Sequence, residues 1–187
     1  MIAIVDYKSG NLTSVRYAMD ALGVEAVVTR DPQVITTADR IIFPGVGAAG
    51  SATANLAELG LTNAVKAAAM SGKPFLGICL GMQILFEHSE EDGGVDLLGI
   101  LPGKVKKFPV AGMKVPQIGW NQVNGGVEYY FVHSYYAEKG AYTTGTTDYA
   151  GVTFTSVAQR GALLAAQFHP EKSGQAGLAF LKEFVSC

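Results

Sequence analysis

The sequence has few charged residues: Asp, Glu, Lys and Arg make up 16% of its 187 residues, where about 25% is usual. A membrane protein is nevertheless excluded, because Gly, Pro or a charge interrupts each apolar run before the ~18 to 20 residues that a spanning helix needs. Apolar residues make up 49% of the chain, which excludes intrinsic disorder. We therefore expect a soluble protein that folds as one domain over residues 1–187.

Basic clusters, cysteine pairs and a secretion signal are also missing. The net charge is −2 and the longest basic run is Lys106-Lys107, so the sequence lacks the electrostatic signature of nucleic-acid binding. The apolar residues 1–5 have no basic n-region before them and are too few for a signal peptide, so we expect a buried strand. Cys79 and Cys187 form no CxxC pair, which excludes a disulfide framework or zinc ribbon and suits a reducing cytoplasm.

Hydrophobic periodicity predicts parallel strands joined by helices in the first half of the chain. The short runs expected to be strands are residues 2–5, 24–28, 41–43 and 73–78, the last of which leads straight into Cys79. Helical spacing over residues 12–22, followed by Gly23, indicates one helix. The Ala-rich segment 52–70 is expected to form two helices separated at Gly60, and residues 80–88 another.

The second half has a different pattern, with short alternating segments and glycine-containing turns. The expected strands are residues 104–108, 117–123, 129–133, 152–158 and 163–168. Turns such as Asn124-Gly125-Gly126 and Arg160-Gly161 are typical of antiparallel strands joined by hairpins. We therefore expect antiparallel strands added to a parallel core, with a last helix over residues 174–184.

A cysteine lies at the expected strand-to-helix junction in Gly77-Ile78-Cys79-Leu80-Gly81. This spacing is typical of a nucleophile elbow, in which the nucleophile occupies a strained turn and flanking glycines make room for the crossing backbone. The turn also places the sulfur at a helix N-terminus, which favours a thiolate. A lone cysteine in an apolar run is commonly a core residue, but the two glycines favour the nucleophile interpretation.

Two further segments follow expected strands and complete a candidate site. His169-Pro170-Glu171 follows residues 163–168, and in extended chain His169 and Glu171 face the same side, as a base and its orienting carboxylate would. His-x-Glu also occurs by chance at strand ends, so it is informative only together with the elbow. Gly45-Val46-Gly47 follows residues 41–43, where a backbone N–H is able to face an oxyanion, although a plain strand-to-helix turn has the same pattern.

Together these motifs resemble the class I glutamine amidotransferases. The segments that carry this resemblance are Pro-Gly-Val-Gly at 44–47, Gly-Ile-Cys-Leu-Gly-Met-Gln at 77–83 and His-Pro-Glu-Lys-Ser at 169–173. Residues 6–12, 116–121 and 130–135 resemble one branch of that family, the glutaminase subunits of imidazole glycerol phosphate synthase. The resemblance extends over the whole chain. It implies a flavodoxin-like, three-layer α/β fold with a mostly parallel central sheet and antiparallel strands added in the C-terminal half.

The resemblance assigns a role to each motif. Cys79 would be the nucleophile, His169 the general base and then acid, and Glu171 the carboxylate that orients the imidazole. Backbone N–H groups of Leu80 and of Gly45 or Val46 would form the oxyanion hole. The reaction implied is hydrolysis of glutamine to glutamate and ammonia through a thioester, with neither a metal nor a cofactor.

Other residues match substrate-binding and partner-facing positions of that family. The substrate-binding residues implied are Gln83, Glu91, His133, Ser134 and Tyr135, and the partner-facing residues are Asn11, Trp120, Tyr130 and Lys172. The partner implied is a (β/α)₈-barrel cyclase that forms a heterodimer with this subunit and consumes the ammonia. The glycines around Val46 lead to the hypothesis that the oxyanion loop is unproductive until the partner binds, so that the isolated chain has little activity.

Three alternatives share part of this pattern. A glutaminase subunit of another ammonia-channelling enzyme, such as pyridoxal 5′-phosphate synthase, would have the same chemistry and a similar length. A protease or deglycase with a cysteine nucleophile would share the elbow but not His-Pro-Glu-Lys-Ser. A binding scaffold with an inactive triad is the third alternative. No role is predicted for Cys187, which has no elbow, base or glycine beside it.

Overall fold

The structure is a computed structural model that describes residues 1–8, 11–109 and 112–187. Ser9 and Gly10, which belong to the matched segment 6–12, therefore lie outside the described residues, as do Val110 and Ala111. No described helix is long and apolar enough to cross a membrane.

The first half of the chain alternates strands and helices, as the periodicity predicts. Its elements are β1 (Ile2–Val5), α1 (Leu12–Ala21), β2 (Ala26–Thr29), α2 (Pro32–Thr37), β3 (Arg40–Gly45), α3 (Ala49–Glu58), α4 (Thr62–Met70), β4 (Phe75–Cys79) and α5 (Leu80–Gln83). The second half is dominated by strands. Its elements are β5 (His88–Ser89), the short 3₁₀ helix η1 (Glu91–Gly93), β6 (Val95–Asp96), β7 (Lys104–Lys107), β8 (Gln117–Gln122), β9 (Glu128–His133), β10 (Tyr135–Ala137), β11 (Thr143–Tyr149), β12 (Val152–Arg160), β13 (Leu163–Ala166), η2 (Pro170–Lys172) and α6 (Gly174–Ser186).

The central sheet has a parallel half and a mostly antiparallel half. Strands β2, β1, β3, β4 and β13 lie side by side in that order, and all of these neighbours are parallel. The sheet continues through β12, β10 and β7 with antiparallel pairs, and β11 pairs with β12. This arrangement confirms the predicted α/β fold, in which antiparallel strands of the C-terminal half extend a parallel core.

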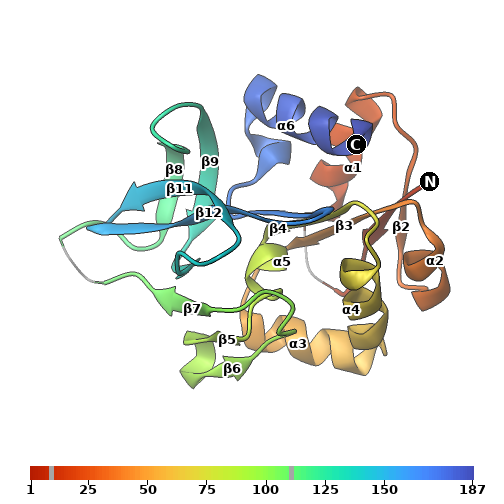
Figure 1. The fold of residues 1–187 in the computed structure, drawn as a ribbon, viewed down its shortest axis with the longest axis horizontal. Helices are drawn as coiled ribbons and strands as arrows, with labels where there is room; N and C mark the ends of the chain where they lie inside the picture. Colours follow the sequence, from red (N-terminus) through yellow and green to blue (C-terminus); the bar gives the residue numbers. More distant parts are fainter. Residues whose placement is uncertain (9–10, 110–111) are drawn as a thin grey trace.

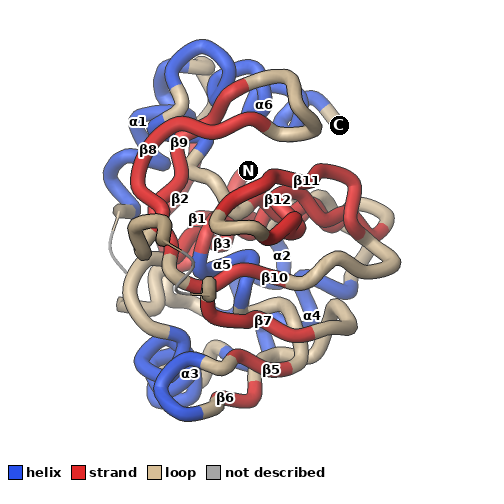
Figure 2. The backbone as a smooth tube through the Cα atoms, turned by 90° about the vertical axis from the view of Figure 1, so that its left-hand side faces the viewer, coloured by secondary structure: helices blue, strands red, loops and turns tan. Residues whose placement is uncertain are grey.

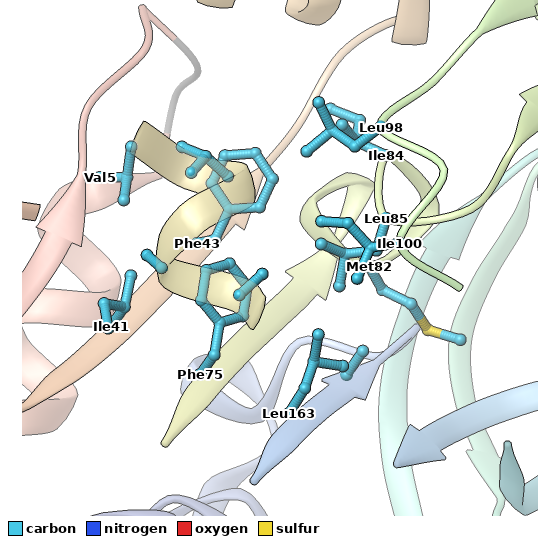
Figure 3. Close-up of a cluster of buried hydrophobic side chains, with 14 of the residues drawn as sticks. Val5, Ile41, Phe43, Phe75, Met82, Ile84, Leu85, Leu98, Ile100 and Leu163 are labelled. Carbon is cyan, nitrogen blue, oxygen red and sulfur yellow. The ribbon is translucent and has the colours of Figure 1, made fainter. Parts of the chain in front are cut away.

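Helices cover both faces of the parallel strands, which makes three layers (Figure 1). Side chains of β1 alternate between the faces: Ile2 and Ile4 pack with α1 and α6, whereas Ala3 and Val5 pack with the opposite helices. Figure 3 shows the larger core on the latter face, which includes Val5, Ile41, Phe43, Phe75, Met82 and Leu163. The strands are apolar on both faces because each face is covered.

Strands β8 and β9 form a separate two-stranded sheet beside the central one (Figures 1 and 2). Strand β9 contacts η2 and α6, and β8 contacts β11. A third cluster of aromatic side chains, which includes Phe108, Phe131, Phe154 and Phe168, lies beneath this hairpin. The hairpin is therefore anchored on the segment that follows β13.

The structure differs from the predicted elements in two ways. The helix expected over residues 80–88 begins at Leu80 but is shorter than predicted, because α5 ends at Gln83 and the Leu85 and Phe86 N–H groups bond three residues back, to Met82 and Gln83. Periodicity also misses α2, β5, β6, β10 and β11. Most of these are too short for a period to be visible, and β11 is rich in Thr with a bulge near Gly145.

Candidate active site

The strained turn predicted around Cys79 is present at the junction of β4 and α5. Cys79 has φ +54° and ψ −110°, a conformation that residues with a Cβ rarely adopt. A Cβ on Gly81 would lie 1.9 Å from the carbonyl oxygen of Phe43, and a Cβ on Gly77 3.0 Å from that of Gly81. The two glycines are therefore required because backbone passes on both sides of the cysteine.

The neighbouring strand supplies the candidate oxyanion loop. Gly45 ends β3 directly opposite Cys79 in the parallel ladder, and a Cβ there would lie 2.2 Å from the Tyr7 hydroxyl. Val46 is 37% exposed and Gly47 has φ +100°. The loop thus runs past Cys79 at the carboxyl edge of the sheet, where ligands bind in open α/β folds.

His169 and Glu171 come from the segment after β13, which is the parallel neighbour of β4. His169 Nδ1 lies 2.8 Å from Glu171 Oε1, and both side chains are almost fully buried. Burial lowers the pKa of His169, but the negative charge of Cys79, the hydrogen bond to it and the Glu171 carboxylate together raise that pKa to about 10. The imidazole is therefore protonated at neutral pH and held between a sulfur and a carboxylate.

A cavity of about 300 Å³ opens over Cys79 and brings most of the predicted site residues together. Its lining residues are Val46, Gly47, Cys79, Leu80, Gln83, Glu91, Pro116, Val132, His133, Ser134, Tyr135, His169 and Lys172. Gly45 and Glu171 do not line it; Glu171 lies behind His169. This volume is at the small end of ligand sites and suits a molecule the size of an amino acid.

Gln83 lies in the buried wall of this cavity. Its Nε2 donates to the carbonyl oxygen of Tyr135 at 2.7 Å and to Gln167 Oε1 at 2.8 Å. Gln167 is fully buried, and its Nε2 donates in turn to Cys79 Sγ at 3.7 Å. The sequence prediction does not include Gln167. The signal that identifies it is its position two residues before His169, on the same side of an extended segment.

His133 is buried and hydrogen-bonded through both ring nitrogens. Nδ1 lies 2.7 Å from the carbonyl oxygen of Tyr135, and Nε2 lies 3.0 Å from Gln117 Oε1. Burial lowers the pKa of His133 to about 4, and the charge of His169 acts in the same direction. This ring is therefore neutral at physiological pH and is not available as a second base.

Glu91 has a structural partner that the sequence does not predict. Its Oε2 accepts a hydrogen bond of 2.8 Å from the Ala49 N–H, and Asp92 Oδ2 accepts one of 3.2 Å from the Gly50 N–H. The helix α3 starts at Ala49 without a side-chain cap of its own, so these acids cap it from another segment. Burial raises the pKa of Glu91, against the effect of the Ala49 hydrogen bond.

The predicted partner-facing residues lie in two places. Trp120 is 54% exposed on β8 and packs edge-on against Tyr130 of β9, with ring centroids 6.1 Å apart. Lys172 is exposed at the cavity wall. Asn11, by contrast, donates from Nδ2 to Glu171 Oε1, so it contacts the triad carboxylate itself.

The arrangement has the parts that cysteine-dependent acyl transfer needs: a nucleophile, a base within reach of it, and a carboxylate that orients the base. Within the described residues, no three His, Cys, Asp or Glu side chains are grouped as a metal site would require.

Comparisons with known proteins agree with this geometry. Residues 3–186 match the family described as Glutamine amidotransferase class-I. The chain is 51% identical to a curated protein of Moorella thermoacetica named imidazole glycerol phosphate synthase subunit HisH, across 98% of this chain and 93% of the relative. A protein of the same name from Methanothermobacter thermautotrophicus is 48% identical, across 99% and 98%. A crystal structure described as a glutamine amidotransferase has the same fold, with a TM-score of 0.75 at 20% identity and full coverage of both chains.

The close backbone approach at Gly81 predicts that a methyl group there strongly lowers the free energy of unfolding. Gly81→Ala is expected to destabilise the protein by about 3 kcal/mol, because its Cβ meets the rigid backbone of β3 and not a movable side chain. The matched control is Gly126→Ala, whose Cβ would lie 3.6 Å from the nearest atom, the Val123 carbonyl oxygen. Urea unfolding of both variants measures the difference, and equal midpoints would contradict the predicted clash.

The ion pair of His169 with the Cys79 sulfur predicts that the pKa of His169 changes when the sulfur is removed. Cys79→Ala is expected to lower the pKa of His169 from about 10 by more than one unit, because the charge and hydrogen bond of Cys79 hold it up against burial. The raised pKa of His169 also implies a pH dependence of stability. The charged ring stabilises the folded state fully below pH 6.5, and this stabilisation is lost as the pH rises through about 10. NMR titration of the ring nitrogens measures the shift.

The control for this titration is Cys187→Ala, which removes the other cysteine, exposed near the C-terminus. That variant is expected to leave the pKa of His169 unchanged. If the pKa of His169 stays near 10 in Cys79→Ala, a group other than Cys79 is responsible for raising it, and the prediction is contradicted.

Proposed function

The chain belongs to the class I glutamine amidotransferases, and we propose that it is the glutaminase subunit of an imidazole glycerol phosphate synthase. The observation that carries the proposal is the identity of 51% to a subunit of that name over almost the whole of both chains. The curated relatives of that name favour this function over the pyridoxal 5′-phosphate synthase alternative.

The first half of the reaction uses the buried ion pair. His169 takes the proton of Cys79, and the thiolate attacks the side-chain carboxamide carbon of glutamine. His169, held by Glu171 at 2.8 Å, then gives its proton to the departing nitrogen, so that ammonia leaves and a γ-glutamyl thioester remains. The carboxylate keeps the ring in the tautomer and orientation that both proton transfers need.

Hydrolysis of the thioester returns the site to its starting state. Neutral His169 removes a proton from water as the water attacks the thioester carbonyl, and the carbon–sulfur bond breaks to release glutamate. In both halves the carbonyl oxygen becomes negative. Leu80 N–H follows the nucleophile directly, and a backbone N–H of Gly45 or Val46 is the second donor proposed. Loss of one such donor typically costs ~10² to 10³ in rate.

The remaining cavity residues are proposed to hold the substrate. Gln83, Ser134 and Tyr135 surround the space beside the sulfur. Glu91 is proposed to face the substrate α-ammonium with its free edge while its Oε2 caps α3. His133, neutral and engaged at both nitrogens, supports the wall as an uncharged group.

The proposed partner is a (β/α)₈-barrel cyclase subunit that consumes ammonia in histidine biosynthesis. Ammonia is protonated in water and then no longer nucleophilic, so its production beside the acceptor subunit is an advantage. The exposed Trp120 and the half-buried Tyr130 form an aromatic pair suited to an interface, and Asn11 and Lys172 lie beside the triad. A heterodimer in the cytoplasm is the assembly proposed.

The direct test is glutamine-dependent product formation by the chain mixed with a cyclase subunit. Cys79→Ala is expected to abolish glutamate release and glutamine-dependent cyclisation while leaving the ammonia-dependent reaction of the partner intact. Cys187→Ala is the matched control and should be as active as wild type. An active Cys79→Ala complex would refute the proposed nucleophile.

The same assay without the partner tests the loop around Val46. The isolated chain is expected to release glutamate far more slowly than the complex. Equal rates would refute the hypothesis that the oxyanion loop is unproductive alone. Growth of a histidine auxotroph rescued by the gene for this chain distinguishes the proposed pathway from the alternative.

Trp120 provides a test of the interface. Trp120→Ala is expected to weaken partner binding by about 2 kcal/mol, or roughly 30-fold, because a large exposed aromatic group loses its contact. Met70→Ala is the control, since Met70 is 68% exposed on α4. Titration calorimetry measures both affinities, and equal loss in the two variants would place the interface elsewhere.

A further inference from the structure

The side-chain amide of Gln167 contacts the reacting sulfur, and the motifs of the site do not account for it. Gln167 lies between β13 and His169 and is fully buried. Its backbone N–H donates to the carbonyl oxygen of Ser156 on β12 at 2.9 Å, which fixes the residue against the sheet. Its Nε2 lies 3.7 Å from Cys79 Sγ. A buried amide in this position needs a partner for each of its polar atoms.

The orientation of this amide follows from one backbone carbonyl. The carbonyl oxygen of Tyr135 only accepts hydrogen bonds, so the Gln83 atom 2.7 Å from it must be the NH₂ group. The second hydrogen of that group needs an acceptor, and it meets the Gln167 side chain at 2.8 Å. Gln167 must therefore present its oxygen to Gln83, which leaves its NH₂ group facing the sulfur.

Apart from the charged ring of His169, the other surroundings of the sulfur give limited support to a thiolate, so an uncharged donor adds to its stability. Helix α5 has only four residues, so its dipole is that of a single turn. The carbonyl oxygen of Val132 lies 3.7 Å from Sγ; it accepts from the thiol but repels the thiolate. Of the side chains around the sulfur, His169 carries the proton that it has taken, and Gln167 supplies an uncharged donor.

We propose that Gln167 is a hydrogen-bond donor to the Cys79 thiolate and that Gln83, through Tyr135, holds it in the donating orientation. The inference rests on the proposed glutaminase function, which makes the Cys79 sulfur the nucleophile. Gln167 stabilises the charged nucleophile before substrate arrives. The same hydrogen-bond chain connects the sulfur to the wall of the substrate cavity, since Gln83 and Tyr135 both line it.

The test is the pH dependence of Cys79 alkylation by iodoacetamide in the complex with the cyclase subunit. Gln167→Met keeps the length of the side chain but has no donor, so the alkylation midpoint is expected to rise by about one pH unit. The kcat for glutamine hydrolysis should fall about tenfold. Gln167→Glu keeps an acceptor for Gln83 but places an oxygen at the sulfur. The pH midpoint of Cys79 alkylation in this variant should rise at least as much as in Gln167→Met.

The matched control is Ser156→Ala. Ser156 is equally buried next to Gln167 on β12, and its hydroxyl has no hydrogen-bond partner among the described residues. The pH midpoint of Cys79 alkylation in Ser156→Ala should equal that of the wild type. A merely structural role for Gln167 would reduce stability and kcat without moving the midpoint, and unchanged midpoints in both Gln167 variants would overturn the inference.

A measurement on the wild-type chain needs no substitution. The Gln167 side-chain amide resonances are expected to shift when Cys79 is alkylated, and their failure to shift would also overturn the inference. The proposed function is tested separately, because a wild-type complex that releases no glutamate refutes that function whatever the alkylation midpoint is. An active wild-type complex with unchanged midpoints refutes only the role of Gln167.

Discussion

The site depends on backbone approaches that are too close for any side chain. At Gly81 the helix after the nucleophile crosses the end of β3, and a Cβ would lie 1.9 Å from the Phe43 carbonyl oxygen. At Gly177 helix α6 packs on the turn after His169, and a Cβ would lie 1.8 Å from the Pro170 carbonyl oxygen. Rigid backbone therefore fixes both Cys79, the proposed nucleophile, and the segment of His169, its proposed base. The strained φ of Cys79 persists because the surrounding sheet leaves no alternative.

Much of the fold and of the candidate site follows from local patterns in the sequence. The elbow is encoded within five residues, and His169 and Glu171 are related by strand alternation, so both are visible without tertiary information. The meeting of the two segments follows once β4 and β13 are adjacent parallel strands, which their apolar character favours but does not specify. The resemblance to a known family implied that the two segments act in one site, without giving the order of the strands.

What the sequence did not predict depends on contacts between distant segments. Glu91 caps α3 because η1 folds onto Ala49, a contact 42 residues apart in sequence. Asn11 reaches Glu171 across 160 residues. Helix α5 ends at Gln83, and the carbonyls of Ile84 and Leu85 accept from the N–H groups of Leu98 and Ile100, although residues 80–88 have enough apolar residues for a longer helix. Local propensity has no access to such tertiary contacts, which override it.

Strand β9 contacts both the proposed catalytic residues and the aromatic pair proposed to face the partner. The ring of Tyr130 packs against Trp120. The backbone carbonyl of Tyr130 accepts a hydrogen bond of 2.9 Å from the backbone N–H of His169, and the Tyr130 N–H donates to Ser173 Oγ at 2.9 Å. Two residues later on the same strand, the carbonyl of Val132 lies 3.7 Å from the nucleophile. Tyr130 of the aromatic pair proposed to meet the partner therefore lies on the strand whose carbonyls bond to the backbone N–H of His169 and contact the sulfur of Cys79. A shift of this hairpin would therefore change the surroundings of His169 and Cys79 together.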